Sequence, residues 1–300
     1  MKQPVFQGVC TAIVTPFTSS GEVDFEAFDR LIDRQLSAGV SAICVCGTTG
    51  ESATLTEKEH SELIDACVRR VGGRAKVVAG TGSNNTAHAL TLSRQAQALG
   101  ADALLLVTPY YNKTTQAGLI QHYTYIADRV DVPIIVYNVP SRTGLGCTAQ
   151  TYEVLSHHPN INGVKEASGD FSLVARTRAL CGDELNLWSG NDDQTVALMA
   201  LGGQGVISVY SNLVPEGMVA IAQKCLEGDF PGAVTLQSQA MELMDALFLE
   251  VNPIPVKTAL TLAGLPAGPL RLPLWEMSPG HVETLKAAME RAGLTLAEKQ

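Results

Sequence analysis

The amino-acid sequence predicts a single (β/α)8 TIM barrel with a helical appendage at its C-terminal end. Short apolar runs, often β-branched, alternate with amphipathic stretches of about 12–15 residues, and eight such runs follow one another. Strand signals stop after Ser211, whereas helical patterns continue. A repeat of roughly 25–32 residues over eight units favours a closed barrel over an open doubly wound sheet.

The expected elements follow one another in regular order. Strands are expected at residues 8–17, 42–47, 76–82, 101–109, 133–140, 161–168, 185–192 and 205–211, with helices between them at residues 25–37, 57–71, 86–99, 116–129 and 193–201. Thr56 with Glu59 matches a capping box, and Asn85 and Gly100 fit the start and end of the next helix. No GxGxxG motif follows the first strand, which disfavours a dinucleotide-binding fold.

The C-terminal part of the chain has helical patterns at residues 215–226, 231–249, 255–263 and 281–291, with Gly, Pro and Asn at the breaks. We therefore expect two domains, a barrel that carries the functional site at residues 1–226 and a helical domain at residues 227–300.

The composition disfavours several classes of partner. The 300 residues are 46% hydrophobic and 17% charged, which is typical of a globular protein with a large core. A formal net charge of −9 argues against binding of nucleic acid or an anionic membrane surface. No apolar run reaches the roughly 18 residues that span a bilayer, and residues 1–6 lack the apolar core of a signal peptide. We therefore expect a cytoplasmic protein.

The cysteines and histidines show no metal-binding pattern. The seven cysteines contain no CxxC pair, and the six histidines lack zinc-site spacing. Cys44 and Cys46 lie two positions apart on one expected strand, so we expect both on the same face, as small buried apolar residues. We expect no metal and no cofactor.

Lys165 lies in an expected strand, residues 161–168, that otherwise has a buried pattern. One interpretation is a lysine at a strand end whose ammonium group reaches water. The functional interpretation is that burial favours a neutral amine, which attacks carbonyl groups to form Schiff bases. The other strand ends favour the second interpretation, because active sites of (β/α)8 barrels lie at the C-terminal ends of the strands.

Polar groups suited to a 2-oxo acid lie at several of these ends. The turn at residues 47–51, GTTGE, holds Thr48 and Thr49 where backbone N–H groups can bind a carboxylate. A tyrosine such as Tyr137 beside a lysine amine can shuttle protons, and Arg142 can hold a carboxylate through two hydrogen bonds. The structural alternatives are a plain turn, a core tyrosine and a surface arginine.

The remaining strand ends carry Tyr110, Tyr111, Gly190 and Ile207. Glycine at a strand end allows a ligand to approach the backbone closely. A lysine with hydroxyl groups, tyrosines and one arginine, without metal ligands, fits carbon–carbon bond chemistry on a 2-oxo acid through an enamine.

Over essentially its whole length the chain resembles the pyruvate-dependent class I aldolases and lyases related to dihydrodipicolinate synthase and N-acetylneuraminate lyase. The shared motifs are GTTGE at residues 47–51, YNVP at residues 137–140, NPIPVK at residues 252–257 and the strand of Lys165. SRTG at residues 141–144 resembles the synthases, because the neuraminate lyases usually lack an arginine there.

The resemblance to the synthases implies a Schiff-base-forming lyase. It would condense pyruvate with L-aspartate 4-semialdehyde on the diaminopimelate route to lysine. A member of the same family that acts on a sugar acid, such as N-acetylneuraminate or a 2-keto-3-deoxy acid, is the first alternative. A catalytically silent barrel that senses a 2-oxo acid is the second, and the retention of every catalytic residue type disfavours it.

The resemblance also implies a role for each site residue. Lys165 would form the Schiff base with pyruvate, and Tyr137 would donate and accept protons through a relay with Thr48 and Tyr111. Tyr111 would enter the site of a neighbouring subunit, which implies a homotetramer built as a dimer of dimers. The implied binding residues are Thr49 for the pyruvate carboxylate, Gly190 and Ile207 close by, and Arg142 for the carboxylate of the aldehyde.

Feedback-inhibited members of the family bind lysine at a subunit interface. The corresponding positions here are Ser52, Ala53, His60, Asn84, His88 and Tyr110. The feedback-sensitive members usually carry a glutamate at the position of His88, and its carboxylate pairs with the ε-amine of lysine. A histidine does not supply that charge, so the resemblance implies weak or absent inhibition by lysine.

Overall fold

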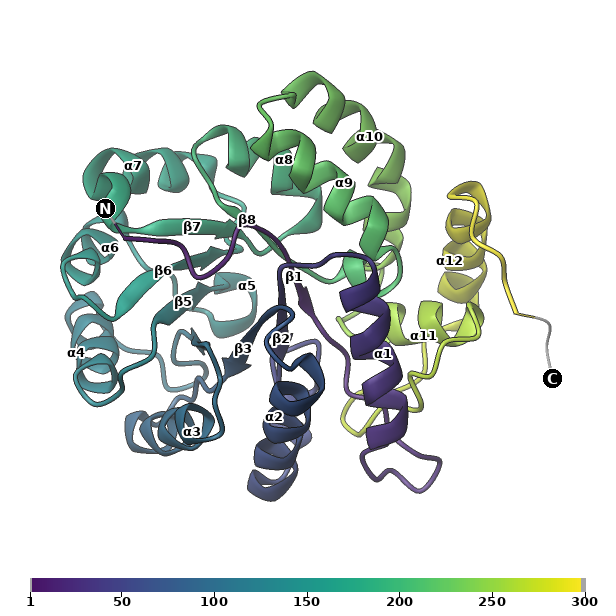
Figure 1. The fold of residues 1–300 in the computed structure, drawn as a ribbon, viewed down its shortest axis with the longest axis horizontal. Coiled ribbons are helices and arrows are strands. Elements are labelled where there is room, and N and C mark those ends of the chain that lie inside the picture. The colour runs from purple at the N-terminus through teal and green to yellow at the C-terminus, as the bar shows by residue number, and fades with distance from the viewer. Residues whose placement is uncertain (1, 298–300) are drawn as a thin grey trace.

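The computed structural model describes residues 2–297 and shows a closed barrel of parallel strands (Figure 1). The strands are β1 (Gly8–Ala12), β2 (Ala42–Val45), β3 (Lys76–Gly80), β4 (Ala103–Val107), β5 (Ile134–Asn138), β6 (Ile161–Glu166), β7 (Asn186–Ser189) and β8 (Gly205–Ser208). Each strand pairs with the next, and β8 pairs with β1 to close the barrel. The predicted (β/α)8 fold is therefore confirmed.

Helices form a ring around the barrel (Figure 1). They are α1 (Phe25–Ser37), α2 (Glu57–Val71), α3 (Thr86–Ala98), α4 (Gln116–Ala127), α5 (Pro140–Thr143), α6 (Ala149–Ser156), α7 (Phe171–Cys181), α8 (Thr195–Ala200) and α9 (Pro215–Leu226). Four 3₁₀ turns lie in the loops: η1 (Ser52–Thr54), η2 (Gly182–Glu184), η3 (Asp192–Gln194) and η4 (Tyr210–Asn212). The predicted capping box begins α2, since the Glu59 amide donates to Thr56 Oγ1 at 3.2 Å and the Thr56 amide to Glu59 Oε2 at 2.9 Å.

All eight strands end earlier at their C-terminal ends than the apolar runs predict. β1 ends at Ala12 and β6 at Glu166, whereas the runs continue to residues 17 and 168. The residues that follow β1, such as Val14 and Phe17, are buried although they form no strand. An apolar run indicates burial, and burial continues into loops that cover the core. These loops carry the candidate site.

Two apolar cores pack on the two faces of the barrel wall. One fills the barrel interior and includes Cys10, Cys44 and Ile207, and the other lies between the strands and the helices and includes Cys46. The expectation that Cys44 and Cys46 share a face is wrong, because β2 ends at Val45 and Cys46 adopts a φ of 55°. All seven cysteines are free thiols and buried, as expected for small apolar residues.

The N-terminal end of the barrel is filled by the start of the chain. The ring of Phe6 stacks on Trp188 with 5.0 Å between the centroids, and Trp188 Nε1 donates to the Phe6 carbonyl at 3.3 Å. Gly163 makes room for the indole, since a Cβ there would lie 2.6 Å from the Trp188 ring. In the register of the sheet Trp188 pairs with Lys165, so this aromatic packing supports the strand that carries the lysine.

Three further helices, α10 (Phe230–Ala246), α11 (Ile254–Leu262) and α12 (Pro279–Arg291), follow the eighth βα unit and lie on one side of the barrel (Figure 1). α10 packs against α9, and α12 packs against α10 and α11. The boundary after residue 226 coincides with the end of α9, and the division into two domains stays a prediction. Within residues 2–297, no helix combines the length and apolar character that crossing a membrane requires.

A buried ion pair ties α11 to the loop that follows β2. Lys257 Nζ lies 2.8 Å from Glu51 Oε1, and the two side chains are 2% and 0% exposed. Lys257 also donates to the carbonyls of Thr15 at 3.0 Å and Pro269 at 2.6 Å. Burial lowers the pKa of Lys257, and the charge of Glu51 opposes this shift. Removal of one partner would leave an uncompensated buried charge, so this contact fixes the turn at residues 47–51.

Candidate active site

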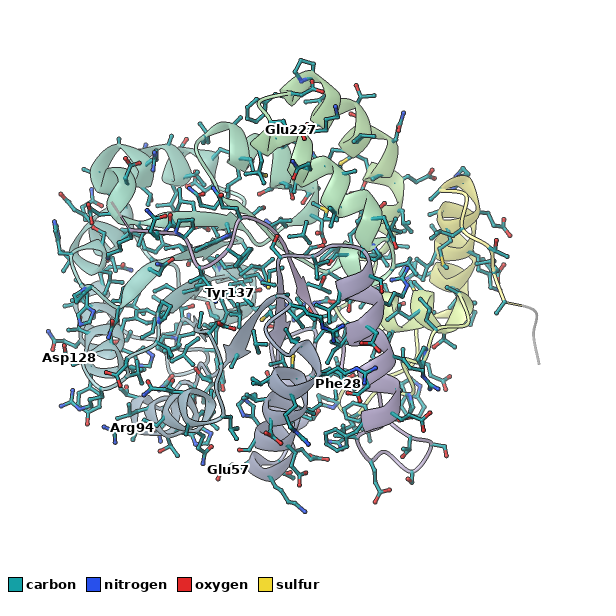
Figure 2. The ribbon with its side chains drawn as sticks, viewed as in Figure 1. Phe28, Glu57, Arg94, Asp128, Tyr137 and Glu227 are labelled. Atoms are coloured by element: carbon teal, nitrogen blue, oxygen red, sulfur yellow. The ribbon has the colours of Figure 1, made fainter. Side chains whose placement is uncertain are left out.

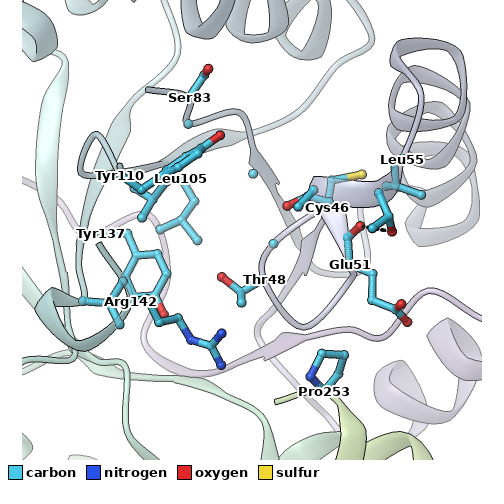
Figure 3. A pocket seen from close by; sticks show the side chains of 18 of the residues that line it. Cys46, Thr48, Glu51, Leu55, Ser83, Leu105, Tyr110, Tyr137, Arg142 and Pro253 are labelled. Atoms are coloured by element: carbon cyan, nitrogen blue, oxygen red, sulfur yellow. Dashed lines mark hydrogen bonds between the residues drawn. The ribbon is translucent and has the colours of Figure 1, made fainter. Parts of the chain in front are cut away.

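A pocket of about 530 Å³ opens at the C-terminal ends of the strands, and Tyr137 on its wall lies near the centre of the molecule (Figures 2 and 3). Thr48 projects into it between Tyr137 and Arg142 on one side and Glu51 on the other (Figure 3). Among the predicted site residues, the lining side chains are Thr48, Tyr137, Arg142, Ser52, Ala53, His60, His88 and Tyr110. Lys165, Thr49, Gly190, Ile207, Tyr111 and Asn84 do not line it.

Lys165 is buried behind this wall. It pairs in register with Tyr137, is 6% exposed, and its Nζ lies 4.2 Å from the centroid of the Tyr137 ring. The lysine thus contacts a lining residue of the pocket, and the snorkelling interpretation does not describe it. Beside it, Glu166 points to the other face of β6, where Asn138 and the Tyr152 hydroxyl donate to its carboxylate. Burial raises the pKa of Glu166, and these hydrogen bonds oppose the shift.

A buried carboxyl group that the sequence did not single out lies near Lys165. Asp192 Oδ2 accepts hydrogen bonds from the Val209 amide at 3.0 Å and the Tyr210 amide at 2.9 Å. Burial raises the pKa of Asp192, whereas the hydrogen bonds that it accepts and the positive charge of Lys165 lower it. Aspartates are common at helix starts, so this residue carries no distinctive signal in the sequence.

Gly190 leaves room for the lysine side chain. A Cβ at this position would lie 2.7 Å from the Ala167 Cβ and 3.1 Å from Lys165 Cε. The first distance is too short for two carbon atoms and the second is tighter than most such contacts, so a side chain at residue 190 forces a shift near Ala167 and crowds the lysine stem. Ile207, the other predicted neighbour, is buried on β8 in the barrel interior.

Gly190→Ala is therefore expected to reduce Schiff-base formation. A displacement of about 1 Å at a reacting group costs on the order of 10²-fold in rate. The measurement is the rate at which borohydride traps pyruvate on the protein. Gly280→Ala is the control, because no atom of residues 2–297 outside its own neighbourhood lies within 4 Å of a Cβ there. Equal trapping rates in both variants would show that Gly190 does not shape the lysine site.

The turn at residues 47–51 follows β2 and, within residues 2–297, leaves two of its backbone donors unpaired. The Gly50 amide donates to the Gly47 carbonyl at 3.1 Å and the Glu51 amide to the Thr48 carbonyl at 3.0 Å. Within residues 2–297, the amides of Thr48 and Thr49 donate to no other group. Two adjacent unpaired N–H groups in a tight turn bind an anion, which agrees with the carboxylate-binding role expected for this turn.

Asn252 connects that turn to Arg142. Its Nδ2 donates to Thr49 Oγ1 at 3.0 Å, and its carbonyl accepts from Arg142 Nη2 at 3.2 Å. Arg142 lies in α5 and lines the pocket, and its side chain makes no other hydrogen bond within residues 2–297. Its remaining guanidinium nitrogens can therefore bind a ligand.

The three members of the expected proton relay occupy different environments. Thr48 and Tyr137 line the same pocket, and neither hydroxyl forms a hydrogen bond within the described residues. Tyr111 is 92% exposed and adopts a φ of 71°, a backbone conformation that residues other than glycine rarely adopt. The chain alone thus holds Tyr137 against Lys165, places Thr48 on the same pocket as Tyr137, and leaves Tyr111 exposed.

Most of the residues expected to bind lysine line the same pocket as Thr48 and Tyr137. Five of the six line it, and Asn84 lies beside them, where its Nδ2 donates to the Tyr110 carbonyl at 3.1 Å. His60 Nε2 lies 2.8 Å from the Gly80 carbonyl, and burial lowers the pKa of His60. His88 Nδ1 lies 3.6 Å from Glu57 Oε1, so a carboxylate is present next to the histidine.

Comparison with known proteins places the chain in one family. Residues 5–292 match the model of the dihydrodipicolinate synthetase family. A 4-hydroxy-tetrahydrodipicolinate synthase of Thermoanaerobacter sp. (strain X514) is 52% identical over 292 residues, which cover 97% of this chain and 98% of that protein.

Solved structures agree with this match. The chloride-inhibited dihydrodipicolinate synthase from Acinetobacter baumannii complexed with pyruvate is 41% identical, with a TM-score of 0.95 over 97% of this chain and 100% of that one. The enzyme from Cyanidioschyzon merolae with lysine bound is 40% identical, with a TM-score of 0.94 over 98% and 100%. The chain therefore belongs to the dihydrodipicolinate synthetase family.

Proposed function

We propose that the protein is a 4-hydroxy-tetrahydrodipicolinate synthase, which condenses pyruvate with L-aspartate 4-semialdehyde through a Schiff base on Lys165. The observation that carries the proposal is the buried Lys165, whose Nζ lies 4.2 Å from the ring of Tyr137 at the wall of the pocket. The relatives that bear this activity in their names support the choice of substrates.

The first half of the reaction activates pyruvate. The neutral amine of Lys165 adds to C2 of pyruvate, and loss of water gives an iminium ion. The iminium withdraws electrons, so a proton leaves C3 and an enamine forms. Tyr137, which contacts the lysine, moves protons in these steps, with Thr48 as the next hydroxyl in the pocket. The free amides of Thr48 and Thr49 hold the pyruvate carboxylate.

The second half joins the two substrates. The enamine carbon attacks the aldehyde carbon of L-aspartate 4-semialdehyde, whose carboxylate pairs with Arg142. The amino group of that substrate then adds to the iminium carbon, closes the ring and releases the Lys165 amine. Arg142 is suited to this role because its guanidinium lies at the pocket rim with free donors. A sugar acid would need groups that match its hydroxyls at this place.

Pyruvate consumption with and without L-aspartate 4-semialdehyde tests the proposal. Consumption only in the presence of the aldehyde is expected. If pyruvate is trapped on the protein by borohydride but the aldehyde causes no consumption, the family alternative of a sugar-acid substrate gains support. If pyruvate is not trapped at all, the Schiff-base mechanism is wrong for this chain.

We also propose that Tyr111 completes the site of a neighbouring subunit in a homotetramer, because the chain directs this side chain outward. Coexpression provides a sharp test. Lys165→Ala and Tyr111→Phe subunits are each expected to be weakly active alone. A mixed oligomer has sites that combine one subunit's lysine with the other's tyrosine, so activity should return. Mixed oligomers that stay inactive would show that Tyr111 does not act across an interface, and sedimentation measures the assembly.

For lysine we propose binding at the residues near His88 with weak inhibition, above about 1 mM. The Glu57 carboxylate already faces His88, so a lysine ammonium must compete for it. His88→Glu is expected to strengthen inhibition. The lysine concentration that halves the activity, measured in the unmodified protein and in the variant, tests this. Sub-millimolar inhibition of the unmodified protein that is lost in Glu57→Gln would show that Glu57 supplies the charge that His88 lacks.

A further inference from the structure

Asn252 follows the barrel strands in the sequence, yet it lies in the candidate site. It is 6% exposed, comes from the segment between α10 and α11, and lines the pocket. Its two hydrogen bonds reach the two residues proposed to bind substrate carboxylates. The side-chain amide bonds to Thr49, proposed for pyruvate, and the main-chain carbonyl bonds to Arg142, proposed for the aldehyde.

The hydrogen bond to Thr49 sets the direction of the threonine hydroxyl. A hydroxyl has one hydrogen to donate, and Asn252 Nδ2 occupies one of the lone pairs of Oγ1 at 3.0 Å. The Thr49 hydrogen must therefore point elsewhere. Within residues 2–297 it has no acceptor, and it belongs to the same turn as the free amides of Thr48 and Thr49. The turn then offers the Thr49 hydroxyl as a donor beside the two free amides.

The amide of Asn252 holds this orientation at a cost. Its Oδ1 is buried and has no hydrogen-bond partner within the described residues. A buried acceptor without a partner destabilises the folded state. A residue that served only stability would be better replaced by an apolar side chain of similar shape, so the unpaired oxygen is typical of a group retained for function.

We propose that Asn252 is a positioning residue for pyruvate, whose side chain turns the Thr49 hydroxyl into a donor for the substrate carboxylate. The inference rests on the proposed function. Arg142 is bound through the main-chain carbonyl of the same residue, and a side-chain substitution leaves that carbonyl in place. The side chain of Asn252 therefore acts on the pyruvate step and not on the aldehyde step.

The test compares Asn252→Ala, Asn252→Asp and Thr258→Ala. Thr258 is the control, because within the described part of the chain its hydroxyl bonds only to the Ile254 carbonyl of its own helix and it does not line the pocket. Asn252→Ala is expected to raise the pyruvate concentration for half-maximal borohydride trapping by about tenfold, with the KM for the aldehyde changed less than about twofold. Asn252→Asp keeps the shape but accepts the Thr49 hydrogen and repels the carboxylate, so its loss should be larger, about 100-fold.

A double-mutant cycle gives a second, independent readout. Thr49→Val removes the hydroxyl, so adding Asn252→Ala to it should cause little further loss of pyruvate affinity. Unchanged trapping in Asn252→Ala, or a full second loss in the Thr49→Val background, would overturn the assignment. An equal rise of the KM for pyruvate and the KM for the aldehyde in Asn252→Ala, together with a loss of thermal stability, would also overturn it. If the unmodified protein traps no pyruvate, the proposed function fails instead, and the two failures are distinct.

Discussion

Lys165→Ala is expected to abolish the pyruvate adduct that borohydride traps on the protein and to lower turnover by more than about 10⁴-fold. The expectation follows from the position of the lysine. It is 6% exposed at the C-terminal half of β6, and its Nζ lies 4.2 Å from the ring of Tyr137. Without the amine there is no iminium ion, and therefore no electron sink for the proton that must leave C3 of pyruvate.

Mass spectrometry of the protein after borohydride treatment measures this loss directly. Lys76→Ala is a suitable control, because Lys76 is a half-exposed lysine on β3 that pairs with Asp102 at 2.8 Å. The control should retain the adduct. An adduct that persists in Lys165→Ala would place the Schiff base on another lysine, and Lys257 is then the one to examine, since it is buried among the carbonyls of Thr15 and Pro269.

The fold and the burial of Lys165 could be predicted from the sequence because both depend on local patterns. The alternation of apolar runs and amphipathic stretches reports which residues are buried, and eight repeats close into a barrel. Lys165 stands out because a charged residue breaks a buried run. The same reasoning placed the ends of the strands too far along the chain, because Val14 and Phe17 are buried in the loop after β1 just as they would be in a strand.

The rest of the site depends on contacts between distant parts of the chain. Asn252 meets Thr49 across 203 positions, and Lys257 meets Glu51 across 206. The motif NPIPVK was recognisable in the sequence. No local pattern, however, predicts that its asparagine bonds to Thr49 or that its lysine pairs with Glu51. Cys46 and Glu51 adopt φ values of 55° and 53°, which lie outside the strand conformation, so the face of Cys46 could not be predicted from period-two alternation.

Arg142→Ala separates the two halves of the reaction. Pyruvate trapping should stay within about threefold of the unmodified protein, because within residues 2–297 no hydrogen bond joins Arg142 to the turn proposed to hold pyruvate except through the carbonyl of Asn252. The KM for L-aspartate 4-semialdehyde should rise about 10²-fold or more, since a charge-assisted pair with a carboxylate is lost from the pocket. Steady-state kinetics with each substrate varied in turn measures the two effects.

Arg142→Lys distinguishes charge from geometry at the same place. A lysine keeps the positive charge but cannot make two parallel hydrogen bonds to one carboxylate, so it should recover only part of the affinity for the aldehyde. Full recovery of the affinity for the aldehyde would mean that the positive charge alone, without two parallel hydrogen bonds, is enough to bind its carboxylate. Equal loss of trapping and of aldehyde use in Arg142→Ala, with a lowered melting temperature, would instead make the contact with Asn252 structural. The aldehyde carboxylate would then need another partner in the pocket.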